Sequence, residues 1–272
     1  MAFRLVALDI DGTIREPDHP ISERTRLALL AVRETGATVT IATGRSFRSA
    51  VQATRELDLD SPIASFQGAH LADPRTGEVL WHRPLTPDLT KSALEALEEK
   101  GGWDGNVMAF IGADVYVSEL TEWTAPYGDR QEVRMHEVGN LSAIADRRPT
   151  RLVAVGDHGR IEALEADLIQ RFGDEMHVTR SLPHFCEILH PDGGKHKALD
   201  ALGQRLGVTR EETLAFGNGY NDVHMLRWAG MGVAVAGGVP EAEDAADRVA
   251  PSVKDEGPAQ VLEEFLEEGL IG

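Results

Sequence analysis

The sequence has a single cysteine, Cys186, in 272 residues. One thiol excludes an intrachain disulfide and a zinc site built from several cysteines, and it is typical of a reducing compartment. Positive charge is also scarce, because 27 Lys and Arg residues stand against 45 Asp and Glu residues, for a formal net charge of −18. This balance argues against nucleic acid or an anionic membrane as a partner, since both require a positive surface.

Long hydrophobic runs and two familiar binding patterns are missing as well. No stretch of about 18 apolar residues occurs, so no membrane span is expected. His177, His184 and His190 lack the i, i+4 spacing of a helical metal pair. The Gly-Met-Gly at residues 230–232 lacks the third glycine of a dinucleotide-binding turn. We therefore expect a soluble protein of the cytoplasm.

The first third of the chain alternates two kinds of segment. Apolar runs at residues 3–8, 37–42 and 62–66 are typical of buried strands, and amphipathic stretches at 21–36 and 46–57 are typical of helices. This order predicts an α/β fold with a doubly wound parallel sheet and helices on both faces. Burial on both faces also explains why the strand candidates are apolar almost throughout.

The last third repeats this alternation, whereas the middle does not. After a helix at 194–206, strands are predicted at 213–217 and 231–236 around a helix at 221–229. Between the two thirds, short strand candidates and two helical stretches predict a smaller α+β domain inserted into the first. The predicted strands of this domain are at 107–111, 115–118, 151–155 and 185–189, and its helices are at 88–99 and 160–172. The predicted domains are a core of residues 1–83 and 190–272 and an insertion of residues 84–189.

Two acids end the first predicted strand. Residues two apart in extended chain point to the same side, so Asp9 and Asp11 could converge at the carboxyl edge of the sheet, where open α/β folds bind ligands. Two carboxylates at one point repel each other unless they share a cation or a proton. The alternative is structural, because Asp11-Gly12 is also a common turn.

The second predicted strand runs into Thr43-Gly44-Arg45. A hydroxyl, a glycine that allows close approach of the backbone, and the N–H groups of a helix start together favour an anion. Thr43 is equally suited to an ordinary helix cap. Arg45 has two interpretations, a phosphate clamp or a structural partner for an acid, and we favour the second.

Two later segments offer further polar groups. Lys195 opens a helix, where its charge opposes the helix dipole and indicates an anionic partner; a solvated lysine is the alternative, and Lys197 competes for the same role. Residues 216–222 place two amides and an acid in a glycine-rich stretch, which suits oxygen ligands for a hard cation. A plain turn with a helix cap would use the same residues.

In their order along the chain, these segments resemble the haloacid dehalogenase (HAD) superfamily of phosphohydrolases, most closely its Cof-type subfamily IIB with a large inserted cap. The likeness runs nearly end to end. The segments that carry it are "ALDIDGTI", "IATGR", "PIASFQGAHLAD", "EILHPDGGKHKAL", "FGNGYNDVHMLRWAG" and "ADRVAPSVKDEG". It implies a Rossmann-like core and a cap that excludes water and reads the leaving group.

The resemblance also implies a role for each matched residue. Asp9 matches the nucleophile that becomes an aspartyl phosphate, and Asp11 matches the general acid and base. Four residues would bind the phosphoryl group: Thr43, Gly44, Lys195 and Asn221. Four would hold Mg²⁺: Asp9, Asp11 through its backbone carbonyl, Asp222 and Asn218. Two are candidate substrate contacts: Arg45 and Gln67.

Three positions depart from the family pattern. Asn218 stands where an acid is usual, which removes one negative charge and leads us to expect weaker Mg²⁺ binding rather than loss of activity. Gln67 replaces the usual Asn, and Val253 stands in a late loop that often carries an Asn. These two changes concern substrate contacts rather than the reaction itself.

The resulting prediction is a Mg²⁺-dependent phosphatase of small phosphorylated metabolites, with sugar phosphates first, acting as a monomer or homodimer without nucleic acid or membrane. A phosphomutase of the same superfamily would use the same residues and is the nearest alternative. The other alternative is a non-catalytic ligand-binding protein with this fold, for which Asn218 is the motive.

Overall fold

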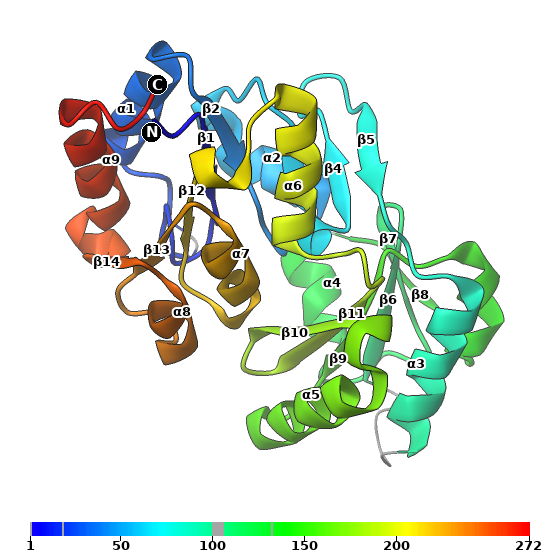
Figure 1. Ribbon diagram of the computed structural model, residues 1–272. Helices are drawn as coiled ribbons and strands as arrows, with labels where there is room; N and C mark the ends of the chain where they lie inside the picture. Colours follow the sequence, from blue (N-terminus) through cyan, green and yellow to red (C-terminus); the bar gives the residue numbers. More distant parts are fainter. Residues whose placement is uncertain (1, 18, 100–105, 132) are drawn as a thin grey trace. The chain divides into compact units, whose positions relative to one another are not determined.

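The computed structural model describes residues 2–17, 19–99, 106–131 and 133–272. Its chain forms two compact units, one made of residues 1–81 and 194–272 and the other of residues 82–193 (Figure 1). The second unit is therefore one continuous stretch of chain inserted into the first. Each unit has its own sheet and its own hydrophobic core.

A five-stranded parallel sheet lies at the centre of the first unit, in the order β14-β13-β12-β1-β2 (Figure 1). Its strands are β1 (Leu5–Leu8), β2 (Thr38–Ile41), β12 (Thr213–Gly217), β13 (Met231–Val235) and β14 (Arg248–Ala250). The central strand β1 places Leu8 opposite both Ile41 and Phe216. The residues that follow β1, β2 and β12 therefore meet at one edge of the sheet.

Helices cover both faces of this sheet. Val6 and Leu8 pack in a core cluster with residues of α1 and α9, whereas Leu5 and Ala7 pack with residues of α6 and α7. The helices of this unit are α1 (Glu23–Glu34), α2 (Phe47–Thr54), α6 (Lys195–Leu206), α7 (Val223–Trp228), α8 (Pro240–Ala245) and α9 (Gly257–Glu267). Its 3₁₀ turns are η1 (Arg55–Leu57), η2 (Phe66–Gly68), η5 (Arg210–Glu212), η6 (Tyr220–Asp222) and η7 (Val253–Asp255). The predicted doubly wound α/β fold is confirmed.

One predicted strand forms but belongs to a different sheet from the one expected. Residues 62–66 contribute only β3 (Ile63–Ser65), which pairs antiparallel with β4 (His70–Ala72). These two strands and β5 (Val79–His82) form a separate three-stranded sheet. The sequence analysis missed β4 and β5, because runs of three or four residues are too short to show a period.

The chain reverses directly after β3. Phe66 and Gln67 have positive φ angles of 49° and 55°, a region that residues other than glycine rarely occupy. Because the chain turns here, β3 cannot extend, and it keeps one parallel bridge to the core sheet, between Ala42 and Ala64. The same turn leaves Gln67 buried.

The second unit contains a six-stranded sheet in the order β10-β11-β9-β6-β7-β8, antiparallel except between β7 and β8. Its strands are β6 (Val107–Ile111), β7 (Asp114–Val117), β8 (Met135–Glu137), β9 (Arg151–Val155), β10 (His177–Leu182) and β11 (Phe185–Leu189). Its helical segments are α3 (Pro87–Glu99), α4 (Ala125–Gln131), η3 (Leu141–Arg147), α5 (His158–Phe172) and η4 (Gly173–Glu175). Apolar side chains of α3 and α5 share one core cluster with the sheet. The predicted α+β class of the insertion is confirmed.

Three strands that the sequence analysis missed are outer strands of their sheets. They are β8 and β10 in the second unit and β14 in the first. Their sequences, MHE, HVTRSL and RVA, mix charged and polar residues with apolar ones. An outer strand has a neighbour on one side only and commonly carries charge, so its apolar pattern is weak.

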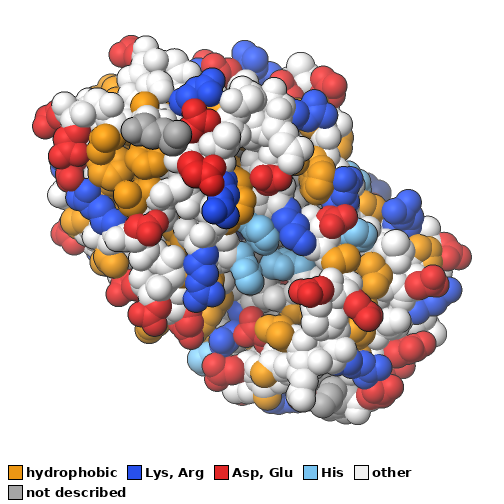
Figure 2. All heavy atoms as spheres, viewed as in Figure 1, with side chains coloured by type: hydrophobic (Ala, Val, Ile, Leu, Met, Phe, Trp, Pro, Cys, Tyr) orange, Lys and Arg blue, Asp and Glu red, His pale blue; other side chains and the backbone are white. Residues whose placement is uncertain are grey.

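In the part of the chain that the structure describes, no helix combines the length and the apolar character that crossing a bilayer requires. On the face drawn in Figure 2, acidic side chains are interspersed with Lys and Arg side chains. Charges of both signs thus occupy the solvent-facing positions there.

Candidate active site

The candidate residues meet at one edge of the core sheet. Asp9 follows β1, Thr43 lies just beyond β2, and the loop at residues 218–222 follows β12, while Lys195 is the first residue of α6. Because these parallel strands end at the same edge, residues far apart in the sequence are brought together there.

Lys195 bridges two carboxylates. Its Nζ donates hydrogen bonds of 2.6 Å to Oδ1 of Asp9 and 2.6 Å to Oδ1 of Asp222. We call these three residues the lysine-bridged triad; their side chains are at most 9% exposed. Burial opposes the charge of Lys195, but Asp222 and Asp9 together outweigh it and raise the pKa of the ammonium. Lys195 is thus the lysine that the fold places between the two acids, while Lys197 is only half-buried.

The glycine-rich loop after β12 holds Asp222. The second carboxylate oxygen of Asp222 accepts the backbone N–H groups of Asn218 and Gly219, each at 2.9 Å. A Cβ on Gly217 would lie 2.5 Å from the Cβ of Asp222, so only glycine permits this approach. The sequence analysis gave a plain turn with a helix cap as the alternative to a cation site at residues 216–222. The turn and the cap are both present, and they orient the Asp222 carboxylate.

The triad contains one negative charge more than its lysine balances. Burial, together with the nearby charges of Asp222 and Asp11, raises the pKa of Asp9 to about 7, although Lys195 opposes the rise. A second positive charge beside Asp9 would relieve this cost, because an opposite charge favours the ionised form. The charge distribution therefore fits a bound cation.

The donor set suits a hard cation with few protein ligands. Among the described residues, no group of three or more His, Cys, Asp or Glu side chains is placed to hold a metal. A site at the triad would therefore combine the carboxylates of Asp9 and Asp222 with neutral oxygens. Mg²⁺ accepts such a set, since it commonly binds one or two carboxylates and retains water.

Asn218 is held by the turn that follows β1. Its Oδ1 accepts a hydrogen bond of 3.0 Å from the Thr13 hydroxyl. A Cβ on Gly12 would lie 2.3 Å from Asn218 Nδ2, and Gly12 has a φ of +82°. The Asp-Gly turn thus coexists with the site. Sequence reasoning missed Thr13, for which a hydroxyl directly after the two acids was the available signal.

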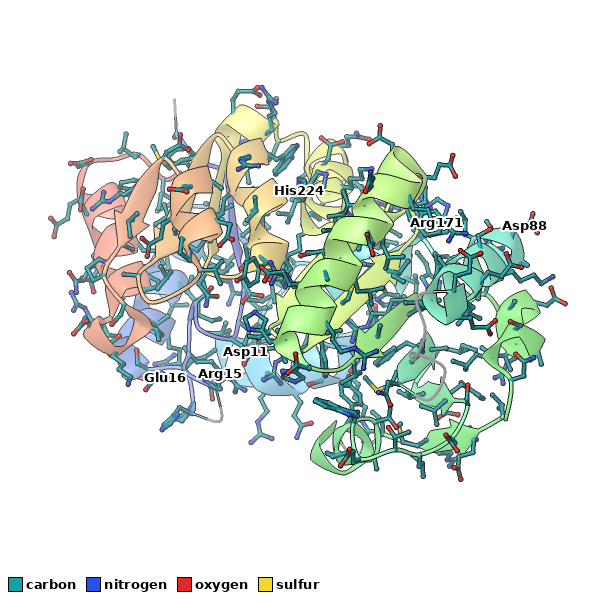
Figure 3. All side chains as sticks on the ribbon, turned by 90° about the horizontal axis from the view of Figure 1, so that it is seen from below. Asp11, Arg15, Glu16, Asp88, Arg171 and His224 are labelled. Carbon is teal, nitrogen blue, oxygen red and sulfur yellow. The ribbon has the colours of Figure 1, made fainter. Side chains whose placement is uncertain are left out.

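Asp9 and Asp11 are hydrogen-bonded to different basic side chains. Asp11 Oδ2 accepts from Arg45 Nε at 2.6 Å, and Asp11 Oδ1 accepts from Arg45 Nη2 at 2.7 Å. Arg15 lies beside the same carboxylate, with Nε 3.6 Å from Oδ1 (Figure 3). We expected both acids to converge on one point. They lie near each other, but Asp9 is hydrogen-bonded to Lys195 and Asp11 to Arg45. The structural pairing favoured for Arg45 is observed.

The remaining candidates form a second group of contacts. Gln67 Oε1 accepts a hydrogen bond of 2.9 Å from Asn221 Nδ2, and a Cβ on Gly44 would lie 2.4 Å from Gln67 Nε2. Thr43 is buried, and its hydroxyl accepts the backbone N–H of Arg45 at 3.2 Å. The helix predicted to start at Asn221 begins instead at Val223, after the η6 turn.

Comparison with known proteins identifies the family of this chain. A family model described as haloacid dehalogenase-like hydrolase matches residues 6–262. The chain is 29% identical over 245 residues to the HMP-PP phosphatase of Cronobacter sakazakii, covering 88% of this chain and 86% of that protein. It is 28% identical over 265 residues to the 5-amino-6-(5-phospho-D-ribitylamino)uracil phosphatase of Bacillus subtilis, covering 96% and 97%.

A solved structure is similar over the same length. The crystal structure of a haloacid dehalogenase-like hydrolase from Bacteroides thetaiotaomicron matches with a TM-score of 0.78 at 26% identity, covering 97% of this chain and 99% of that one. Fold and sequence therefore agree over both units. Because the family model spans nearly the whole chain, this protein belongs to the haloacid dehalogenase-like hydrolases, as the order of its motifs predicted.

Proposed function

We propose that this protein is a Mg²⁺-dependent phosphatase of small phosphorylated metabolites, with sugar phosphates as the first class to test. The observation that carries the proposal is the lysine-bridged triad. A carboxylate that approaches a phosphate dianion meets a repulsion of about 4 kcal/mol per charge pair at 4 Å and an effective dielectric of 20. Lys195, buried against Asp9, supplies charge that offsets this repulsion.

In the first half of the reaction, a carboxylate oxygen of Asp9 attacks phosphorus. The bond from phosphorus to the leaving oxygen breaks with its electron pair, and Asp11 donates a proton to that oxygen. The products are an alcohol and an aspartyl phosphate on Asp9. A difficult displacement is thereby split into two easier steps.

In the second half, water releases the phosphate. Asp11, now ionised, takes a proton from a water molecule whose oxygen attacks phosphorus. The bond between phosphorus and Asp9 breaks, Asp9 regains its carboxylate, and inorganic phosphate leaves. Thr43, Gly44 and Asn221 would bind the phosphoryl oxygens during both steps.

Asp9, Asp222, the backbone carbonyl of Asp11 and Asn218 would hold Mg²⁺. When bound, the ion supplies positive charge to the phosphoryl oxygens. The raised pKa of Asp9 supports this assignment, because burial raises it more than Lys195 lowers it, and a second positive charge would favour the ionised carboxylate. Asn218 brings a neutral oxygen where an acid would add charge, so the Mg²⁺ affinity should be modest.

The relatives support a phosphorylated metabolite as substrate. One is named for HMP-PP and another for a uracil with a phosphorylated ribitylamino group. The second name describes a phosphate on a sugar-like chain, which supports testing sugar and sugar-alcohol phosphates first. The inserted unit, residues 82–193, would read the leaving group.

The test is phosphate release from an aryl phosphate and from a panel of sugar phosphates, with Mg²⁺ and with a chelator. We expect release that needs Mg²⁺ and is abolished by Asp9→Asn. Release that continues in Asp9→Asn would reject the mechanism. Release from aryl and other esters, with none from sugar phosphates, would reject the substrate class alone.

The same assay separates the alternatives. An isomeric phosphoester in place of free phosphate would identify a phosphomutase. Absence of any turnover, together with a rise in melting temperature on adding a phosphorylated metabolite, would identify a binding protein, because a ligand that binds the native state stabilises it.

A further inference from the structure

The contact between Arg45 and Asp11 is a two-pronged fork. Arg45 Nε and Nη2 bond to different oxygens of Asp11, at 2.6 and 2.7 Å. Such paired parallel bonds restrict the carboxylate in both position and orientation. The third guanidinium nitrogen, Nη1, donates to the Ser49 hydroxyl at 3.1 Å, which ties the fork to the first turn of α2.

The backbone of Arg45 is pinned from two sides. Its N–H donates to the Thr43 hydroxyl at 3.2 Å, and its C=O accepts the N–H of Phe66 at 2.8 Å. Ser46, the next residue, caps α2 through the N–H of Ser49. The backbone of Arg45 is therefore held by the end of β2 and the turn after β3, and its guanidinium has a further partner, Ser49, besides Asp11.

Asp11 is less constrained without that fork. Its side chain is 35% exposed, whereas that of Asp9 is 9% exposed. Arg15 is the other cation beside it, but its Nε is 3.6 Å from the carboxylate, beyond hydrogen-bond distance. Arg45 is thus the group whose hydrogen bonds restrict the rotamer of Asp11.

We propose that Arg45 is a positioning residue, which holds the Asp11 carboxylate in place for its work at the leaving group and does not clamp the phosphoryl group. The proposal rests on the proposed function, since it assigns Arg45 to the step that Asp11 performs. It resolves the two interpretations of Arg45 that the sequence leaves open.

Positioning of Asp11 and clamping of the phosphoryl group predict different effects of the leaving group on the rate. A 4-nitrophenolate leaves readily without a proton, whereas the alkoxide of a sugar must be protonated as it leaves. Formation of the aspartyl phosphate, which kcat/KM reports, therefore depends on a residue that acts through Asp11 far more for an alkyl phosphate than for an aryl phosphate. The later release of phosphate by water is common to both esters. A phosphate clamp would affect the binding of both esters, and of inorganic phosphate, to a similar extent.

The experiment compares Arg45→Ala, Arg45→Lys and a control, Arg48→Ala, which removes an exposed arginine of α2, three residues further along the chain. The substrates are 4-nitrophenyl phosphate and an alkyl sugar phosphate that the native protein hydrolyses. We expect Arg45→Ala to lower kcat/KM for the alkyl ester by about 100-fold, within the range for a general acid, with a far smaller loss in kcat/KM for the aryl ester. Arg45→Lys, which keeps the charge and loses the fork, should give an intermediate loss, and Arg48→Ala none.

Inhibition by inorganic phosphate and a double variant complete the test. The inhibition constant of phosphate should not change in Arg45→Ala. In an Asp11→Asn background, removing Arg45 should cost no further activity on the alkyl ester, because two residues that act in one step are not additive. Thermal unfolding of each variant separates loss of function from loss of fold, and Arg45→Lys stands in if Arg45→Ala does not fold.

Two results would overturn the proposal while leaving the proposed function intact. One is an equal loss on both esters with weaker phosphate inhibition, which would make Arg45 a clamp. The other is a loss in the Asp11→Asn background as large as in the native one. Failure of the native protein to release phosphate from any ester would instead overturn the proposed function and the role of Arg45 together.

Discussion

At the scale of single residues, one buried ammonium bridges two buried carboxylates and balances one of their two charges. Lys195, Asp9 and Asp222 come from three separate parts of the chain, and Lys195 donates a hydrogen bond of 2.6 Å to each of the two acids. Removing one partner of a buried charge group leaves an uncompensated charge, which costs more than the pair itself contributes. The lysine should therefore matter for stability as well as for turnover.

Lys195→Met should lower the free energy of unfolding by about 3 to 5 kcal/mol at neutral pH without metal, because two buried carboxylates lose their counter-charge. Urea unfolding in the presence of a chelator measures this. Lys197→Met, two residues away and half-buried, is the matched control and should change stability far less. Equal losses of stability in the two variants would contradict the inference that Lys195 supplies the counter-charge for the buried carboxylates.

The pKa of Asp9 predicts how stability changes with pH. That pKa rises from 3.8 to about 7 in the folded protein, so between these values the folded state binds a proton that the unfolded state lacks. Stability must then fall as pH rises through this window, with a slope of up to about 1.4 kcal/mol per pH unit from this group.

Asp9→Asn removes that contribution. In metal-free buffer, its free energy of unfolding relative to the native protein should increase from about pH 5 to pH 8. Over this range only the native protein is destabilised by ionisation of the buried Asp9. Denaturant unfolding of both proteins at the two pH values gives the difference directly. A difference that does not change with pH would show that Asp9 titrates near its ordinary pKa.

At the scale of elements, the site depends on turns that approach one another closely. The η2 turn after β3 contacts the start of α6, where a Cβ on Gly68 would lie 2.3 Å from the backbone oxygen of Gly194. Gly68 also has a φ of +81°. Glycine at this position thus allows α6 to begin where Lys195 reaches the triad.

Gly68→Ala should therefore destabilise the protein by at least about 3 kcal/mol, from strain and overlap together. Gly77→Ala is the control, because Gly77 has a similar φ of +73° but open space where the Cβ would stand. It should cost only about 1 to 2 kcal/mol, from the positive φ alone. Thermal or urea unfolding measures the loss of stability in each variant. Equal losses would mean that the backbone at Gly194 moves aside without cost when a Cβ is added at residue 68.

At the scale of the whole molecule, the two units differ in how the chain makes them. The first unit needs segments from both ends of the chain, whereas residues 82–193 are continuous and have a sheet and a core cluster of their own. A compact unit of this size, with its own core, meets the conditions for independent folding.

Residues 82–193 expressed alone should therefore fold. We expect circular dichroism typical of a mixed α and β protein and a single cooperative transition in urea. A broad, non-cooperative loss of signal would show that this unit depends on the rest of the chain for its stability.

Much of the fold was predictable from local patterns. The strands at 107–111, 151–155, 185–189 and 213–217 agree with the structure to the residue, because each is a short and mostly apolar run. Outer strands such as β10 were missed because they carry polar residues, and β3 was assigned to the wrong sheet because the positive φ angles after it leave no clear mark in the sequence.

Which polar residues follow the strands can be predicted from the order of residues, since Asp9 and Asn218 each come directly after an apolar run. Which side chains these residues contact depends on the tertiary structure. Asp9 and Asp11 are two residues apart, yet one is buried against Lys195 and the other is held by Arg45. Contacts between residues so far apart along the chain depend on strand order and helix packing, which no local pattern records.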